Sequence, residues 1–164
     1  MSALQIGRLQ VQIDPPAPGR PTVVTLVGRL DDFVPLGELA ARLPPGDVLI
    51  DTAGVPFVNS AGMREWVRLL RVLRDRGTVS LIRLADVLMV HMNVLAECKG
   101  MARIVSFYAT YACDACGYEG ALLVEAVANH DALRALRPPR LPCPECGAPA
   151  ELADFPERYL MIFR

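Results

Sequence analysis

The sequence has almost no excess of charge of either sign. Its 17 basic and 18 acidic residues leave a formal net charge of −1 at neutral pH. Proteins that bind nucleic acids or anionic membranes through a general electrostatic attraction carry a basic excess. We therefore expect no membrane partner, and nucleic acid is a poor candidate for a partner of the chain as a whole.

Long apolar runs are also missing. The most apolar helical stretch, VLMVHMNVLA, is too short to span a bilayer and contains His91 and Asn93. The first residues, MSALQIGRLQ, lack the basic start and the apolar core of a signal peptide. From both absences we expect a cytoplasmic protein.

Histidine is scarce, and this limits the catalytic chemistry that can be assigned. His91 lies in an apolar stretch, and His130 lies between two pairs of cysteines. No nucleophile with a neighbouring base can be nominated from this pattern. We predict that the protein is not an enzyme.

The 164 residues, of which 52% are hydrophobic, can form one core of about 100–150 residues with a small appendage. The composition changes near Tyr111, which predicts a first domain at 1–110 and a second at 111–164. No Gly/Ser-rich linker separates them, so the second module should be docked rather than tethered.

The first domain is predicted to be α/β, with helices packed on a mixed sheet. Trp66 and Cys98 should be buried. Strands are expected at residues 4–13 and 22–28, which should form a hairpin, and at 47–51, 78–84 and 103–111. Helices are expected after Asp31-Asp32, from 60 to 76, and from Asp86 to about Lys99.

The stretch PFVNSAGMREW, residues 56–66, contains a serine at the start of the best-defined helix. Asn59 or Ser60 can cap the helix by accepting a hydrogen bond from a free backbone N–H group. Alternatively, Ser60 is modified or is contacted by a partner, because a helix N-terminus favours the negative charge of a phosphate. The arginines Arg64, Arg68 and Arg71 follow on one face, either as a solvated surface or as a partner contact.

Residues 22–108 resemble a STAS domain, the fold of bacterial anti-sigma factor antagonists and of the cytoplasmic part of sulphate transporters. The segments that carry the resemblance are Gly28-Arg29-Leu30-Asp31, Val48-Leu49-Ile50-Asp51, Phe57-Val58-Asn59-Ser60-Ala61-Gly62-Met63, Gly77-Thr78-Val79 and Lys99-Gly100-Met101.

The resemblance implies a regulatory protein-binding module, either an anti-sigma factor antagonist or a related partner-switching adaptor. The implied partner is an anti-sigma factor or a serine kinase, and the implied phosphorylation site is Ser60. The family's loop usually reads Asp-Ser-Ser-Gly or Asp-Ser-Ala-Gly, whereas this chain has Asn59 in place of the acid. The candidate partner-binding residues are Asn59, Ser60, Gly62, Arg64, Arg68 and Arg71.

Two C-x-x-C-G motifs define the second module. Each pair of thiolates can be directed at one metal ion by a tight turn, and the glycine that follows permits the backbone of that turn. Four cysteines leave no open coordination position, so the pattern predicts a structural Zn²⁺ in a zinc ribbon. The predicted ligands are Cys113, Cys116, Cys143 and Cys146. His130 could replace a ligand, but we expect a surface residue.

Two other functions are compatible with these cysteines. Many zinc ribbons bind nucleic acid or the transcription machinery, yet residues 111–164 contain eight acids and five arginines, a net charge of −3. A thiol redox sensor would use the same cysteines without metal. The last residues, FPERYLMIFR, are apolar enough to return as a strand against one of the two modules.

Overall fold

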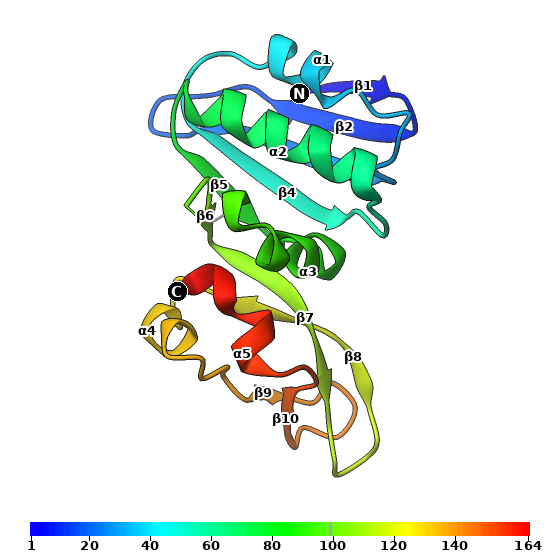
Figure 1. Cartoon of the computed structure of the whole chain (residues 1–164), viewed down its shortest axis with the longest axis vertical. Helices are drawn as coiled ribbons and strands as arrows, with labels where there is room; N and C mark the ends of the chain where they lie inside the picture. Colours follow the sequence, from blue (N-terminus) through cyan, green and yellow to red (C-terminus); the bar gives the residue numbers. More distant parts are fainter. Residues whose placement is uncertain (99) are drawn as a thin grey trace.

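A computed structural model describes residues 1–98 and 100–164 of the chain. The molecule is elongated, with a six-stranded sheet at one end and a four-stranded sheet at the other (Figure 1). The predicted α/β class, a mixed sheet with packed helices, is confirmed. Lys99 lies outside the described residues. It belongs to one of the segments that carry the resemblance to a STAS domain, and it was the expected end of the third helix.

The first sheet has the strand order β1-β2-β3-β4-β5-β6. The first three strands are antiparallel, and β3 to β6 are parallel. Each parallel connection contains a helix. The elements are β1 (Ser2–Ile6), β2 (Leu9–Asp14), β3 (Thr22–Gly28), α1 (Leu36–Arg42), β4 (Val48–Gly54), α2 (Ser60–Arg74), β5 (Val79–Ile82), α3 (Asp86–Val94), the 3₁₀ turn η1 (Ala96–Cys98) and β6 (Arg103–Ile104).

The core of this end forms where α1, α2 and α3 pack on the sheet. The long helix α2 lies across it in Figure 1 and directs its apolar face inward, as the 3.6-residue spacing predicts. Trp66 and Cys98 are buried, which confirms both predictions.

Two predictions at the N-terminal end are wrong. Residues 4–13 are two strands, because Gly7 adopts a positive φ of 58° and the chain turns there. Asp31 and Asp32 do not cap α1, which begins at Leu36 after Pro35. The Asp31 carboxylate instead accepts a hydrogen bond from the N–H of Phe33 at 3.1 Å.

The predicted strand 103–111 is divided between the two sheets. Its first part is β6, which pairs with β5, and its second part is β7 (Ser106–Ala112), which belongs to the other sheet. Between them, the N–H of Val105 donates to the carbonyl of Leu81 at 2.8 Å. Strand β7 therefore runs across the predicted 110/111 boundary and joins the two ends of the molecule directly.

The second sheet has the antiparallel order β8-β7-β10-β9. The long hairpin of β7 and β8 dominates the lower half of Figure 1. The remaining elements are β8 (Glu119–Glu125), α4 (His130–Arg134), β9 (Leu141–Pro142), β10 (Pro149–Leu152), α5 (Pro156–Tyr159) and the 3₁₀ turn η2 (Met161–Phe163).

The C-terminal segment docks on α3, but it is not the predicted strand. It forms α5 and η2, because Pro156 occupies the first turn, where its missing N–H costs nothing, and the Asp154 carboxylate accepts the N–H of Phe155 at 2.6 Å. The side-chain oxygen of Asn93 on α3 accepts the N–H of Ile162 at 2.9 Å. The expectation of a docked second module therefore agrees with the structure.

Candidate functional site

The two C-x-x-C-G motifs form two turns with the same backbone hydrogen bonds. In the first, the N–H of Cys113 donates to Tyr118 and the N–H of Gly117 donates to Cys113, both at 2.8 Å. In the second, the N–H of Cys143 donates to Ala148 at 2.8 Å, and Gly147 donates to Cys143 at 2.9 Å.

Both glycines adopt a left-handed conformation, which agrees with the prediction that glycine permits the backbone of these turns. Gly117 has a φ of 78° and Gly147 has a φ of 75°. The two motifs are therefore equivalent in backbone geometry.

Strand pairing brings the two turns together. The first turn connects β7 to β8, and the second connects β9 to β10. Because Glu151 of β10 pairs with Ala112 of β7, the second turn is placed beside Cys113. All four sulfur atoms lie within 4.8 Å of one another, as a common metal site requires.

The sulfur positions fit a tetrahedral metal better than they fit disulfides. Cys113 Sγ lies 3.6 Å from Cys146 Sγ, and Cys116 Sγ lies 3.6 Å from Cys143 Sγ. A disulfide has an S–S length of about 2.05 Å. With Zn–S bonds of about 2.3 Å, the edge of a tetrahedron of sulfurs is about 3.8 Å.

The surroundings of Cys143 favour its thiolate. Desolvation raises the pKa of Cys143, but the backbone N–H groups of Cys146 and Glu145 and the adjacent Cys116 thiol outweigh it, so the pKa is lowered to about 7. The thiolate is the form that binds a metal ion. A backbone hydrogen bond lowers the pKa of Cys116, but desolvation and the neighbouring thiols outweigh it and raise this pKa to about 12, so the lowered value belongs to Cys143 and not to the whole cluster. The four cysteines can hold a metal ion because their sulfur atoms lie within 4.8 Å of one another. His130 lies on the surface, as expected, with its Nδ1 3.3 Å from Asp131 Oδ1.

A second candidate site lies at the start of α2, in the first half of the chain. Asn59 is the residue that caps this helix, and its side-chain oxygen accepts the N–H of Gly62 at 2.9 Å. Its side-chain nitrogen donates to Asp32 Oδ1, also at 2.9 Å. Ser60 is therefore not needed as the cap, and its side chain is exposed.

Ser60 borders a groove between α2 and α3. The groove has a volume of about 260 Å³ and a mainly apolar lining. Met63 and Val67 contribute from α2, and Val94 and Leu95 contribute from the end of α3. Val94 is 71% exposed.

The three arginines of α2 differ in their partners. Arg68 pairs with Glu65 at 2.7 Å, and Arg71 pairs with Glu97 at 2.5 Å. Within the described part of the chain, Arg64 makes no ion pair, and it borders the groove beside Ser60. Of the three, Arg64 has its charge available to a bound group.

Gly62 has a structural place in this site. A Cβ atom at position 62 would lie 2.1 Å from the carbonyl oxygen of Leu30, so only glycine allows α2 to approach this segment closely. Gly62 is buried, and its lack of a side chain allows the first turn of α2 to pack against Leu30.

The contributions of α3 and of Asp32 to this site were not predicted from the sequence. The signal for α3 was present, because its sequence is apolar on nearly every side, whereas a helix on the surface of a domain usually has one polar face. For Asp32 there was no signal, because its contact with Asn59 joins residues that are 27 positions apart.

No protein-family model matches this sequence, and no curated protein matches it at a significant level. Among the helices of residues 1–98 and 100–164, none combines the length and the apolar character needed to cross a membrane.

Proposed function

We propose that the chain is a cytoplasmic, non-enzymatic, STAS-like binding module that carries a structural zinc ribbon. Its work is regulatory protein binding, as an anti-sigma factor antagonist or a related partner-switching adaptor, with Ser60 as the phosphorylated residue. The observation that carries the proposal is the exposed Ser60 on the border of the apolar groove between α2 and α3.

The apolar groove and the neighbouring Arg64 suit a partner that has an apolar side chain with an acidic group close to it. The apolar residue would fill the space between Met63 and Val94, and the acid would pair with Arg64. Such a partner would leave the Ser60 hydroxyl at the edge of the interface.

A phosphate on Ser60 would act against this partner. It would add about −1.5 to −2 charges at neutral pH beside the groove. Arg64, one turn along α2, would be drawn to the phosphate and away from the partner's acid. Phosphorylation would therefore release the partner, and a phosphatase would restore binding.

For the second module we propose a zinc ion held by Cys113, Cys116, Cys143 and Cys146, with a role in folding and in protein contact. The acidic balance of residues 111–164 supports this role over binding to nucleic acid. The distance between the paired sulfurs favours a metal over a redox disulfide.

The test is the affinity of the protein for the serine-kinase anti-sigma factors of its own cells, measured by calorimetry. We expect one of them to bind the wild type and Ser60→Ala, and to bind Ser60→Asp at least about tenfold more weakly, a loss of about 1.4 kcal/mol. With ATP and Mg²⁺, that kinase should add one phosphate to the wild type and none to Ser60→Ala.

Ser2→Asp is the matched control, because Ser2 is an exposed serine on β1, away from α2. It should bind as the wild type does. The proposal fails if none of these kinases binds, or if Ser60→Asp and Ser2→Asp bind equally well.

A further inference from the structure

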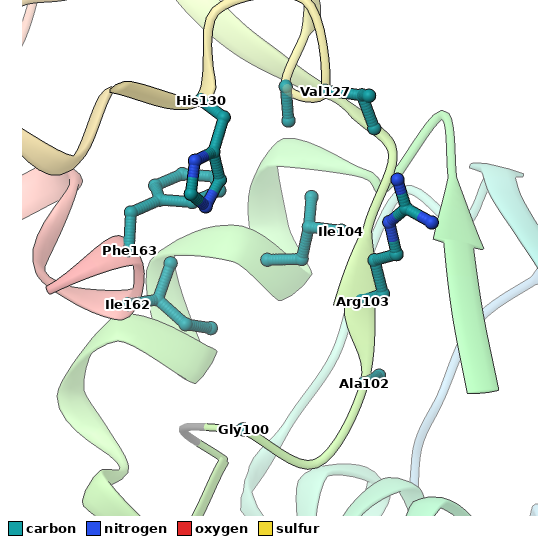
Figure 2. A pocket seen from close by; sticks show the side chains of 9 residues that line it. Gly100, Ala102, Arg103, Ile104, Val127, His130, Ile162 and Phe163 are labelled. Carbon is teal, nitrogen blue, oxygen red and sulfur yellow. The ribbon is translucent and has the colours of Figure 1, made fainter. Parts of the chain in front are cut away.

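A cavity of about 530 Å³ lies where the two ends of the molecule meet (Figure 2). Three segments form it: the chain that leads into β6, from Gly100 to Ile104; the chain from Ala126 to His130; and residues Ile162 and Phe163 of η2. Its volume falls within the range of about 300–1,000 Å³ that is usual for small-molecule sites. It is separate from the cysteines and from the groove beside Ser60.

Hydrogen bonds and ring contacts hold the walls of this cavity in place. The N–H groups of Ala126 and Val127 both donate to the carbonyl of Val105, at 2.9 and 3.3 Å. The N–H of Ile162 donates to the side chain of Asn93, and the ring centroid of Phe163 lies 5.5 Å from that of Phe107. The cavity is therefore preformed, which reduces the ordering cost of binding.

Among the described residues, the lining combines an apolar surface with one arginine side chain. Ile104, Val127, Ile162 and Phe163 provide the apolar surface, and Arg103 provides the charge. No acidic residue is among those that line the cavity. In the portion of the chain that the structure describes, Arg103 makes no ion pair, so its guanidinium is available to an anion.

The aromatic and branched apolar side chains of the lining suit a flat ring. In Figure 2 Phe163 and His130 are on one side of the cavity, Arg103 is on the opposite side, and Ile104 is between them. Aromatic faces favour a planar ring, and the side chains of Ile104 and Ile162 can cover its faces and edges. His130 Nδ1 lies 3.3 Å from Asp131 Oδ1, so Arg103 is the side chain of the lining that is assigned to the anionic group.

From these observations we propose that this cavity binds a planar aromatic carboxylate, with its ring beside Phe163 and its carboxylate on Arg103. The proposal assigns a small-molecule site to the junction of the two modules and does not depend on Ser60 or on the metal.

The experiment titrates the full-length, metal-loaded protein with 2-naphthoate and, separately, with the uncharged 2-naphthamide, followed by the amide NMR signals. The shifts should centre on Val127, His130 and Phe163. Because a hydrogen bond to a charged group contributes about 1.5–3 kcal/mol, naphthoate should bind at least about tenfold more tightly than naphthamide.

Two variants and a control locate the site. Arg103→Gln should reduce naphthoate affinity at least about tenfold and leave naphthamide unchanged. Phe163→Ala should weaken both ligands, with thermal unfolding used to verify that the variant is folded. Arg42→Gln, an exposed arginine in the last turn of α1, should bind both ligands as the wild type does.

Three results would overturn the proposal. The first is an absence of saturable binding of naphthoate at millimolar concentration. The second is equal affinity for the acid and the amide. The third is unchanged naphthoate binding by Arg103→Gln.

Discussion

The amide of Asn59 makes one hydrogen bond as an acceptor and one as a donor, and a carboxylate could make only the first. Its oxygen caps α2 through Gly62, and its nitrogen donates to Asp32. An aspartate at position 59, as in the resembling family, would place a carboxylate against Asp32. Asp32 therefore favours asparagine over aspartate at position 59.

This arrangement predicts that Asn59→Asp destabilises the protein by about 1 kcal/mol at pH 7, since one hydrogen bond is replaced by repulsion. The exchange Asp32→Asn with Asn59→Asp restores a donor opposite an acceptor. It should return the free energy of unfolding to within about 0.5 kcal/mol of the wild type. Urea unfolding of the single and double variants measures both. A double variant no more stable than Asn59→Asp would contradict the account of this pair.

Gly147 tests the backbone of the second cysteine turn. With a φ of 75°, an alanine would be strained although no atom lies within 4 Å of its Cβ, so we expect a loss of about 1–2 kcal/mol. Metal affinity should fall with it, because the turn directs Cys143 and Cys146. Chemical unfolding and competition with a zinc chelator measure the two effects.

Gly37→Ala is the matched control. Gly37 lies in α1 with a helical φ and open space around it, so alanine should stabilise the protein by about 0.5–1 kcal/mol. If Gly147→Ala were equally stabilising, the strained turn would be excluded.

At the scale of elements, the C-terminal segment fastens the second module to α3. The side chain of Tyr159 is buried, and its hydroxyl donates to Asp86 at the start of α3 and lies 3.1 Å from the carbonyl oxygen of Tyr108 on β7. One side chain thus contacts a helix of the first module and a strand of the second sheet.

Tyr159→Phe should therefore cost about 1–3 kcal/mol, because it removes the hydroxyl that donates to the half-buried carboxylate of Asp86. Thermal or urea unfolding at pH 7 measures the loss. Tyr108→Phe is the control, since no hydrogen bond joins the Tyr108 hydroxyl to the described residues. The two variants should differ clearly, and equal stability would argue against a fastening role for Tyr159.

The same residue predicts an alkaline loss of stability. Burial raises the pKa of Tyr159 well above its ordinary value, and the hydrogen bond to Asp86 adds to this shift. The folded state therefore holds the proton more tightly than the unfolded state does. Stability is fully present below the unfolded pKa of about 10 and is lost as the pH rises above it.

From this sign we expect the wild type to lose more free energy of unfolding than Tyr159→Phe between about pH 9.5 and 11. Urea unfolding across this range provides the comparison. Parallel pH profiles for the two proteins would contradict a raised Tyr159 pKa.

At the scale of the whole molecule, local patterns were predictable and pairings between distant segments were not. The cysteine turns and α2 followed from spacing alone, because both depend on residues within a few positions of one another. The division of residues 103–111 between two sheets depends on Leu81, whose carbonyl accepts the N–H of Val105. This contact joins residues that are far apart in the sequence, so it could not be predicted from local patterns.

In the C-terminal segment, the helix-start residues were present in the sequence, but the apolar residues were given more weight. Its apolar residues suggested a strand, whereas Asp154 and Pro156 mark the start of a helix. The groove beside Ser60 could not be predicted, since it exists only where α2 and α3 meet. The four cysteines and the start of α2 could thus be located from the sequence, whereas Asp32 and the part of α3 that borders the groove were not predicted.

The four-thiolate metal centre is the central claim about the molecule, because it determines whether the second module is a ribbon or a set of free thiols. The most direct measurement is the intact mass of the protein purified from its own cells, first under native and then under denaturing conditions. We predict a native mass greater than that of the chain by one zinc ion, and loss of that ion on denaturation. A native mass equal to that of the bare, reduced chain would contradict the claim and favour the redox alternative.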